Sequence, residues 1–472
     1  MKVLKFGGSS LADGERIRSV AEVVSRAAGS DRVAVVLSAM KGITDNIISA
    51  ARSAEEGTDA FKPVLETIRG KHFDAVRFLF PPADQAAALT PLALMCNELE
   101  EILHGVELIR ECSPRTLDLL MSFGERLSCQ LAAAYMRSRG MDAVLVDARE
   151  LILTDDHFGS ASVNFDRSYE RIEAHLSAIG GIAVIAGFIG ATGKGVTTTI
   201  GRNGSDYTAS IIGAGARAEL IEIWTDVDGV LSADPRIVPD AFVIPHLSYE
   251  EAMELSYFGA KVIHPYSMVP AVERSIPLII KNSLNPSAPG TLIAAGAGAG
   301  GTGPGRSGRV GRAVTGIASI PGISLVNIEG GGMMGIPGFA ARIFSVLARE
   351  GVNIIMISQA SSEHTICLVF RTAEGERALA ALNHELTMEL ETHRIERFQL
   401  MRDLLVVSVI GENMAGTPGI AGRLFSSLGQ AGVNVLVIAQ GSSERNISFV
   451  IEEKDHTLAL RTIHAAFLTN HA

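Results

Sequence analysis

The stretch MKVLKFGGSSLADGERI (residues 1–17) carries the pattern on which the rest of the chain is built. Residues 3–6 are typical of a short buried strand, and Gly7 and Gly8 remove every side chain where the backbone turns. Lys5 places a charge inside the apolar run, which is costly when buried without a partner. The stretch therefore predicts a strand, a glycine turn and a following helix, with an anion close to Lys5.

The same alternation of short apolar runs and amphipathic segments continues to about residue 293. Several runs are apolar throughout, as expected for strands that are covered on both faces. We therefore expect an α/β fold in which a mainly parallel sheet is flanked by helices. The predicted strands are VLKF (3–6), VAVVL (33–37), AVLV (143–146), IAVIA (182–186), LIEIW (220–224) and PLIIK (277–281).

Two segments interrupt this alternation and define the domains. Residues 46–138 have almost no strand pattern, and the apolar spacing in 91–112 is typical of a helix, so we expect a helical insertion that packs beside the sheet. The run AAGAGAGGTGPGRSGRVG (294–311) is dominated by Gly and Ala and predicts a flexible linker. The expected organisation is a catalytic domain over 1–293 and a linker over 294–312.

Beyond the linker the sequence repeats itself. Residues 336–370 align without gaps on residues 417–451, so that Asn353 pairs with Asn434. Each copy reads as Pro-Gly, a helix, a Gly-Val-Asn turn, a strand, a Ser-Ser-Glu turn and a second strand. Two copies are too few for a solenoid, so a paired module is expected, with domains over 313–398 and 399–472.

The composition excludes several classes of protein. A net charge of −11 argues against a nucleic-acid or membrane-surface protein, because either normally carries a basic face. No apolar run is long enough to span a bilayer, and the N-terminus has no signal-peptide pattern. The four cysteines form no C-x-x-C pair, which favours free buried thiols in a reducing cytoplasm over zinc or disulfides. A cytoplasmic protein without a metal site of its own is expected.

Three candidate sites follow predicted strands or begin helices in the first half of the chain. KFGGSS (5–10) suits backbone contacts to a phosphate, with Lys5 neutralising charge, although a tight turn with a solvent-facing lysine fits equally. LSAMKGIT (37–44) places hydroxyls where open α/β sheets bind ligands, or is a plain capping turn. Glu125 in FGERLS falls at an expected helix start, where it binds a substrate ammonium or stabilises the helix dipole.

Three further candidates lie in the second half of this region. TIGRNGSDYTAS (199–210) opens a helix with a guanidinium suited to a carboxylate, or is a turn with paired surface charges. WTDVDGVLSADPR (224–236) has acids and an arginine at a strand end, which suit magnesium-phosphate contacts. YFGAKVIHP (257–265) places Lys261 after small apolar residues. No nucleophile–base pair is evident, so these sites fit phosphoryl transfer by positioning and electrostatics.

These six motifs, in this order, closely resemble those of aspartate kinase, an enzyme of the amino-acid-kinase fold. The duplicated tail resembles the paired ACT domains, α+β units of βαββαβ type, that regulate it. The resemblance is nearest to the kinase half of bifunctional aspartokinase–homoserine dehydrogenase. No G-x-G-x-x-G region follows the repeat, so a single activity is expected.

The resemblance implies transfer of phosphate from ATP to the β-carboxylate of L-aspartate, giving 4-phospho-L-aspartate on the route to lysine, threonine and methionine. Mg²⁺ would be held mainly through the ATP phosphates. Lys5 and Asp206 would be catalytic. Aspartate would be bound by Ser38, Thr44, Glu125, Arg202 and Ser205. ATP would be bound by Lys5, Gly7, Gly8, Ser9, Thr225, Asp226, Leu231, Arg236, Lys261 and Val262, although relatives often have Tyr where this chain has Leu231.

The ACT repeat implies feedback by an amino acid and assembly into a homodimer or larger. The Q-x-S-S-E motif favours threonine rather than lysine as that amino acid. The matching effector positions are Asn353, Gln359, Ser361, Asn434, Gln440 and Ser442. Two alternatives remain open at this point. One is another kinase of the same fold acting on glutamate, acetylglutamate or a nucleotide. The other is a non-catalytic amino-acid sensor that retains the ACT pair.

Overall fold

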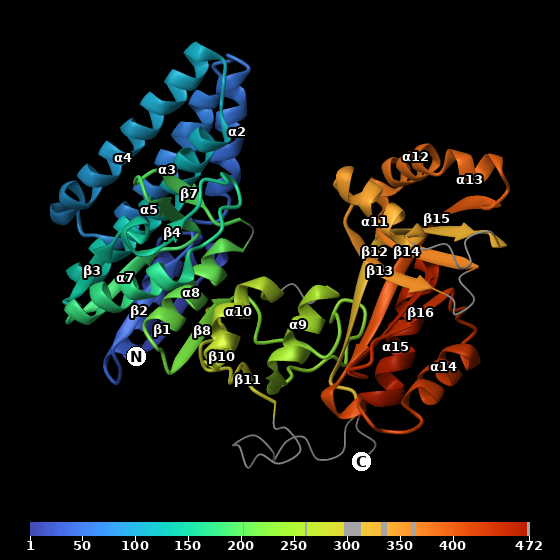
Figure 1. Cartoon of the computed structure of the whole chain (residues 1–472). Coiled ribbons are helices and arrows are strands. Elements are labelled where there is room, and N and C mark those ends of the chain that lie inside the picture. The colour runs from blue at the N-terminus through green and yellow to red at the C-terminus, as the bar shows by residue number, and fades with distance from the viewer. Residues whose placement is uncertain (202, 260–261, 297–312, 332–337, 360–363, 470–472) are drawn as a thin grey trace. The chain divides into compact units, whose positions relative to one another are not determined.

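The computed structural model describes residues 1–201, 203–259, 262–296, 313–331, 338–359 and 364–469. The chain forms two compact units, and it passes between them more than once (Figure 1). The described residues of the first unit lie within Met1–Val230, Val243–Tyr249 and Val262–Ala299. Those of the second lie within Leu231–Phe242, Glu250–Lys261 and Gly300–Ala472.

The first unit is built on an eight-stranded sheet in the order β3-β5-β2-β1-β8-β10-β11-β9. Neighbouring strands are parallel except for β10 and β11, which are antiparallel. All six strands predicted from the sequence are present, and the expected fold class is confirmed. The strands are β1 (Lys2–Phe6), β2 (Val33–Leu37), β3 (Ala143–Val146), β5 (Ile182–Ala186), β8 (Leu220–Thr225), β9 (His246–Ser248), β10 (Leu278–Asn282) and β11 (Thr291–Ala294).

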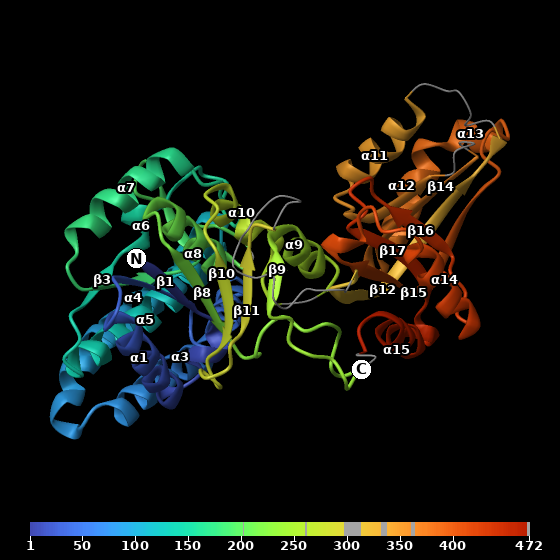
Figure 2. The same cartoon turned by 90° about the horizontal axis from the view of Figure 1, so that it is seen from below.

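Helices cover both faces of this sheet, which is why strands such as β2 are apolar throughout. Figure 2 shows α1 and α5 on one face and α7 and α8 on the other. A separate three-stranded sheet in the order β4-β6-β7 lies in the same unit. The remaining elements here are η1 (Gly8–Leu11), α1 (Gly14–Ala28), α6 (Ala148–Leu151), β4 (Leu153–Thr154), α7 (Phe165–Ala178), β6 (Ile189–Thr192), β7 (Thr197–Thr199), α8 (Gly204–Gly215) and α10 (Pro265–Glu273).

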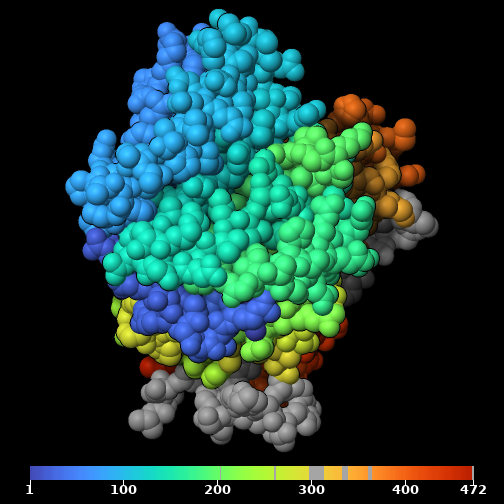
Figure 3. All heavy atoms as spheres, turned by 90° about the vertical axis from the view of Figure 1, so that its left-hand side faces the viewer, coloured from blue at the N-terminus to red at the C-terminus, as the bar shows by residue number. Residues whose placement is uncertain are grey.

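The predicted helical insertion is present as four helices, α2 (Ile43–Glu55), α3 (Phe61–Leu79), α4 (Pro82–Ile109) and α5 (Pro114–Ser138). Helix α4 buries the apolar positions that the sequence spaces at helical intervals, including Leu92, Leu99 and Leu103. In Figure 3 these helices, in blue and light blue, adjoin the teal and green residues that follow them in the sequence. Helix α5 belongs to the sheet as much as to the insertion, since it contacts β2, β3 and β5.

The second unit contains a six-stranded antiparallel sheet in the order β13-β14-β12-β15-β17-β16. Its two central strands are long, and bulges near Ile320 and Ile323 interrupt their pairing. Apolar residues of the two repeats form two separate cores on this sheet. Residues 231–242 join the core of the second repeat, where Ala233 and Val238 are buried among residues of β15, β17 and α14.

The order of helices and strands in the second unit agrees with the repeat in the sequence. They are β12 (Gly316–Glu329), α11 (Phe339–Arg349), β13 (Ile354–Gln359), β14 (Thr365–Arg371), η4 (Thr372–Glu374), α12 (Gly375–Glu385), α13 (Thr387–Glu391), β15 (Arg397–Ile410), η5 (Glu412–Met414), α14 (Ile420–Gln430), β16 (Val437–Gln440), β17 (Asn446–Glu452), η6 (Glu453–Asp455) and α15 (His456–Phe467). Helix α9 (Tyr249–Tyr257) begins at Tyr249, where the middle segment of the first unit ends, and its other residues belong to the second unit.

Candidate active site

The candidate residues meet at the carboxyl edge of the main sheet. Phe6 at the end of β1 lies opposite Leu37 of β2 and Trp224 of β8. Leu37 in turn lies opposite Ala186 of β5. The residues that follow these four strand ends therefore leave the sheet side by side, at the edge where open α/β sheets bind their ligands.

Lys5 and Asp206 form a buried ion pair at this edge. Nζ of Lys5 lies 2.6 Å from Oδ1 of Asp206, and each side chain is 10% exposed. Oδ1 is buried and accepts no hydrogen bond from the described residues, so the contact is an ion pair. Asp206 is placed there by the first turn of α8. The expectation of an anion close to Lys5 is thus met by a carboxylate of the protein itself.

The glycine turn leaves space beside the lysine ammonium. A Cβ on Gly7 would lie 3.4 Å from Nζ of Lys5, and one on Gly8 would lie 3.0 Å from the carbonyl oxygen of Ala39. The peptide N–H of Gly7 donates to the Trp224 carbonyl at 3.3 Å. A side chain on Gly7 would occupy space beside the Lys5 ammonium, and one on Gly8 would crowd the Ala39 carbonyl, so glycine at both positions keeps the turn close to the loop after β2 and the space beside Lys5 open to an anion.

Glu125 lies in the middle of α5, so the expected position at a helix start is wrong. The alternative that Glu125 stabilises the helix dipole is therefore excluded as well. Its side chain is buried, and Oε1 accepts a 3.2 Å hydrogen bond from the N–H of Ala39. Oε2 is buried and has no hydrogen-bond partner among the described residues. Burial raises the pKa of Glu125 to about 8. An ammonium group of a ligand would satisfy the second oxygen and restore the charge.

Helix α5 is held tightly against the loop that follows β2. A Cβ on Gly124 would lie 2.9 Å from the Cβ of Ala39, so only glycine allows this approach. The hydroxyl of Ser128 donates to the carbonyl of Ser38 at 2.6 Å. The turn of α5 that carries Glu125 therefore fixes the backbone on which Ser38 sits. Thr44 lies at the start of α2, and its side chain has no hydrogen bond to the described residues.

The backbone after β5 is strained where it approaches α8. Phe188 has φ of +70°, a conformation that is costly for a bulky residue. Its N–H donates to the Thr208 hydroxyl at 2.9 Å. A Cβ on Gly187 would lie 2.7 Å from that of Ser205, which is itself buried. Neither Gly187 nor Phe188 was expected from the sequence, although a Gly-Phe pair directly after a buried strand was a usable signal.

Asp118 is a further buried carboxylate, and sequence reasoning missed it. It lies on α5, two turns before Glu125. It accepts hydrogen bonds from the hydroxyl of Thr199 at 2.7 Å and from the N–H of Thr199 at 2.9 Å. Both oxygens also accept from the N–H of Gly159, at 3.0 and 3.1 Å. Asp118 thus fixes the end of β7, directly before the motif that continues to Asp206.

The residues predicted to bind ATP divide between the two units. Ser9 lies in the one-turn helix η1. Thr225 is the last residue of β8 in the first unit, and its hydroxyl donates to the carboxylate of Asp226, the next residue, at 3.2 Å. Val262, half-buried, precedes α10. Leu231 and Arg236 belong to the second unit, where Arg236 is 87% exposed and pairs with Asp234 at 2.6 Å. Arg202 and Lys261 lie outside the described residues.

The expected effector positions are exposed in the described part of the repeat. This holds for Asn353, Gln359, Asn434, Gln440 and Ser442. Ser361 lies outside the described residues. The N–H of Asn353 donates to Glu374 at 3.4 Å, and its counterpart Asn434 shows no such contact.

Cysteines and metals add little to the site. All four cysteines are free. Cys96 and Cys129 are buried as expected, whereas Cys112 and Cys367 are half-buried, so for these two the expectation of burial is wrong. Within the described ranges no group of three or more His, Cys, Asp or Glu side chains could hold a metal ion. The helices described here include none long and apolar enough to cross a bilayer.

Comparison with known protein families identifies the family to which this chain belongs. The model of the amino acid kinase family matches residues 1–282, and that of the ACT domain matches residues 326–386 and 407–467. The chain is 34% identical over 476 residues to aspartokinase 1 of Arabidopsis thaliana, covering 98% of this chain and 80% of that protein. The chain belongs to the aspartokinases of the amino acid kinase family. The resemblance inferred from the six motifs is therefore confirmed.

Other aspartokinases agree in sequence and in fold. The chain is 37% identical over 479 residues to the bifunctional aspartokinase/homoserine dehydrogenase of Haemophilus influenzae, covering 100% of this chain and 57% of that protein. It spans about half the length of the bifunctional relatives that it matches. The structure of aspartokinase III from E. coli with aspartate and ADP aligns with a TM-score of 0.80 at 28% identity, covering 99% of this chain and 100% of that one.

Proposed function

We propose that this chain is an aspartate kinase that transfers the γ-phosphoryl group of ATP to the β-carboxylate of L-aspartate. The observation that carries the proposal is the pair of buried carboxylates at one sheet edge. One, Asp206, is matched by Lys5. The other, Glu125, keeps a buried oxygen without a partner. A substrate with both an ammonium and a carboxylate supplies what this arrangement lacks.

In the proposed reaction an oxygen of the β-carboxylate forms a bond to the γ-phosphorus while the bond to the β–γ bridging oxygen breaks, so that ADP leaves. Lys5 would offset charge on the transferred phosphoryl group, and Asp206 would hold the ammonium group of Lys5 in place. The turn at Gly7 and Gly8 would leave room for the phosphates to approach Lys5. Such a site accelerates the reaction by alignment and charge stabilisation, without a covalent intermediate on the protein.

Glu125 and Arg202 would select the substrate. The unpaired oxygen of Glu125 would accept from the α-ammonium of aspartate, and Arg202 would bind the α-carboxylate, with Ser38, Thr44 and Ser205 beside them. An N-acylated substrate presents no ammonium, so acetylglutamate fits this arrangement poorly. The structure of the E. coli relative in complex with aspartate and ADP supports the same choice of substrates.

Mg²⁺ would enter with ATP. The described residues offer no cluster of ligands for a resident ion, while Asp226 stands exposed at the end of β8 near the glycine turn. Mg²⁺ prefers to keep waters and substrate phosphates as ligands, and bound there it would neutralise phosphate charge. Thr225, Asp226, Leu231, Arg236, Lys261 and Val262 are the residues proposed to complete the nucleotide site.

Feedback through the repeat has a physical route in this fold. Residues 231–242, which include two of the residues proposed to bind ATP, pack into the core of the second repeat. Ser232 anchors them through a hydrogen bond to His464 at 3.2 Å. A change in the repeat therefore acts on this loop directly. We propose threonine as the effector over lysine, on the Q-x-S-S-E turns. Lysine occurs with a related E. coli aspartokinase III, so it is the competing candidate.

We also propose that the chain assembles as a homodimer or larger. The edge strands β13 and β16 expose Ile357 and Ile438, at 45% and 46%. The two edges meet within the chain, because the Ser358 hydroxyl donates to the Ile438 carbonyl at 3.1 Å, so the support for assembly is the exposed apolar side chains rather than a free strand edge. A cytoplasmic location, on the route to lysine, threonine and methionine, completes the proposal and agrees with four free cysteines.

The deciding test is aspartate-dependent ADP release, with the acyl phosphate trapped by hydroxylamine. We expect Lys5→Met to lower kcat by at least about a hundredfold, because the transferred charge loses its partner. Lys2→Met is the matched control, since Lys2 lies on the same strand but pairs with Asp31 at the surface. Equal loss in both variants, or faster turnover of glutamate than of aspartate, would contradict the proposal. Addition of threonine or lysine to the same assay decides the effector.

A further inference from the structure

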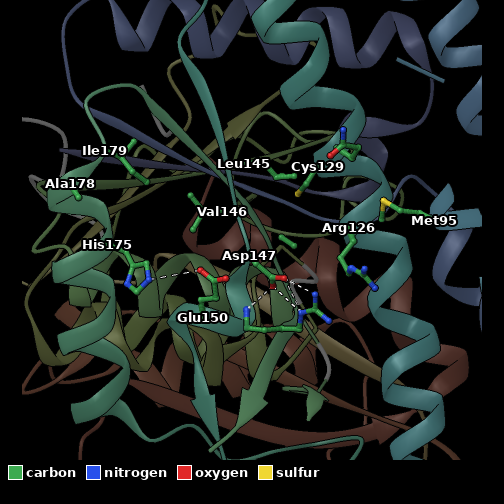
Figure 4. Close-up of a pocket in the computed structure, with 13 residues that line it drawn as sticks. Met95, Arg126, Cys129, Leu145, Val146, Asp147, Glu150, His175, Ala178 and Ile179 are labelled. Atoms are coloured by element: carbon green, nitrogen blue, oxygen red, sulfur yellow. Dashed lines mark hydrogen bonds and ion pairs between the residues drawn. The ribbon is translucent and has the colours of Figure 1, made fainter. Parts of the chain in front are cut away.

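A cavity separate from the candidate active site lies at the outer edge of the main sheet. Its volume is about 530 Å³, within the range of small-molecule sites. Edge strand β3, helix α5 and helix α7 supply most of its wall (Figure 4). The lining residues are Met95, Arg126, Cys129, Gln130, Leu145, Val146, Asp147, Arg149, Glu150, His175, Ala178, Ile179 and Ala186.

Arg126 is the unusual residue of this wall. Its guanidinium is largely buried, with the side chain 19% exposed, yet it donates no hydrogen bond to any described residue. Nη1 is buried without a partner, and Nη2 lies 3.7 Å from Glu98 at the surface. The group stacks on the ring of Phe123 at 4.5 Å, which fixes its position. Leaving a buried guanidinium without acceptors costs several hydrogen bonds.

The carboxylates near Arg126 accept no hydrogen bond from its guanidinium. Asp147 is already saturated by Arg149, with contacts of 2.6, 2.9 and 3.0 Å. Glu150 faces His175 at 3.9 Å on the opposite side of the cavity in Figure 4. Burial and the positive charge of Arg149 lower the pKa of Arg126, and the charges of Glu98 and Asp147, which raise it, offset this only in part. The cavity thus presents one cation with free donors, next to a second cation that is occupied.

Apart from Gln130, the uncharged part of the wall is apolar or weakly polar. Leu145 and Val146 of β3 form the back of the cavity in Figure 4, and Ile179 and Ala178 lie at its end. Leu145 is 42% exposed, so it offers apolar surface to a ligand in the cavity. A ligand that fits needs a single negative group for Arg126 and a short aliphatic body for this surface.

We propose that this cavity binds a small aliphatic carboxylate, with its carboxylate on Arg126 and its apolar body against Leu145, Val146 and Ile179. A free carboxylic acid and an aliphatic amino acid share this chemistry. An amino acid would in addition place its ammonium within the field of Glu150. The proposal concerns binding alone, so it does not depend on the kinase activity proposed above.

The test is isothermal titration calorimetry of the full chain with 4-methylpentanoate, and with 4-methylpentan-1-ol as the neutral control. We expect saturable binding of the acid, one site per chain, and none of the alcohol. Arg126→Gln is expected to weaken the affinity at least about tenfold, or 1.4 kcal/mol. Arg115→Gln, an exposed arginine on the same helix, is expected to leave it unchanged.

A second pair of variants keeps the charge and fills the space. Ala178→Phe is expected to abolish binding, whereas Ala174→Phe, exposed one turn earlier on α7 and outside the cavity wall, is not. This pair decides the result if Arg126→Gln does not fold. Titration with L-leucine then assigns the source, since loss in Ala178→Phe places an amino acid in this cavity. Absence of acid binding, or acid binding that both Arg126→Gln and Ala178→Phe leave intact, would overturn the proposal.

Discussion

The N–H of Ala39 donates a 3.2 Å hydrogen bond to Glu125, eighty-six positions away in the sequence, and it is the one hydrogen bond given to that carboxylate by another described residue. The contact orients the carboxylate but does not neutralise it. Oε2 remains buried without a partner. The buried, unpaired oxygen of Glu125 therefore lowers the stability of the folded protein, and together with the proposed role of Glu125 in binding the substrate ammonium it leads to two predictions.

The first prediction concerns pH. Because the pKa of Glu125 is raised to about 8, most of the free protein carries the protonated acid at pH 7. The carboxylate that binds the ammonium becomes available as the pH rises. We expect kcat/KM for aspartate to increase up to about tenfold per pH unit below 8 and to level off above it. The measurement is a pH profile with saturating ATP, and a profile that is flat from pH 6 to 8 would contradict it.

The second prediction concerns stability. The folded protein holds the proton of Glu125 more tightly than the unfolded chain, so its stability falls as the pH rises from about 4.5 to 8. Glu125→Gln removes this dependence and keeps an acceptor for Ala39. We expect the variant to melt at a higher temperature than the natural chain, by a margin that grows from pH 5 to pH 8.

The same variant is expected to raise the KM for aspartate at least about tenfold, because a neutral amide replaces the partner of the ammonium. Thermal melts at both pH values and steady-state kinetics check the two parts. A lower Tm at pH 8, or an unchanged KM, would remove Glu125 from the proposed site.

The third prediction uses Gly124. Its Cβ would lie 2.9 Å from that of Ala39, so Gly124→Ala pushes the loop away from Glu125. We expect a several-fold rise in the KM for aspartate with a smaller effect on ATP. Gly105→Ala is the control, because it lies in helix α4 with nothing within 4 Å of the added atom. The control is expected to gain about 0.5–1 kcal/mol of stability from helix propensity, with unchanged kinetics.

The fourth prediction assigns Asp118 a positioning role. Asp118→Asn cannot accept every hydrogen bond that Thr199 and Gly159 now donate. We expect a loss of about 1.5–3 kcal/mol in the free energy of unfolding. Aspartate KM is expected to rise as well, because β7 leads into residues 200–206. Asp74→Asn is the control, because the Asp74 side chain is 73% exposed in its ion pair with Arg77. We expect this variant to change the free energy of unfolding by less than about 1 kcal/mol.

If Asp118 were only structural, kinetics measured well below the melting temperature would match those of the natural chain. A change in KM without a change in the pH profile separates a positioning role from a loss of Glu125 chemistry. Unaltered kinetics in a folded Asp118→Asn protein would contradict the prediction.

The fifth prediction tests the link between residues 231–242, which include two of the residues proposed to bind ATP, and the second repeat. Ser232 accepts from the N–H of Phe242 at 3.1 Å and bonds to His464 at 3.2 Å. Ser232→Ala is expected to loosen residues 231–242, to raise the KM for ATP a few-fold and to leave the KM for aspartate unchanged. Ser177→Ala, exposed on α7, is the control. Equal effects on both substrates would argue against a loop specific to the nucleotide.

The sequence by itself determined the strands, the glycine turn after β1 and the two repeats. These features are local, since apolar runs, Gly-Gly and a recurring Gly-Val-Asn turn encode backbone preferences within a few residues. The sequence also brought Lys5 and Asp206 into one hypothesis, because their motifs resemble those of a known family. It misplaced Glu125 at a helix start, since FGERLS carries the same local signals as a helix beginning.

Only the tertiary structure decided which polar groups lose contact with water. The unpaired oxygen of Glu125, the four hydrogen bonds to Asp118 and the lone guanidinium of Arg126 all depend on segments that lie far apart in the chain. The same holds for residues 231–242, which follow a strand of the first unit but belong to the core of the second. Burial and partnership are properties of packing, and packing joins residues that no local pattern relates.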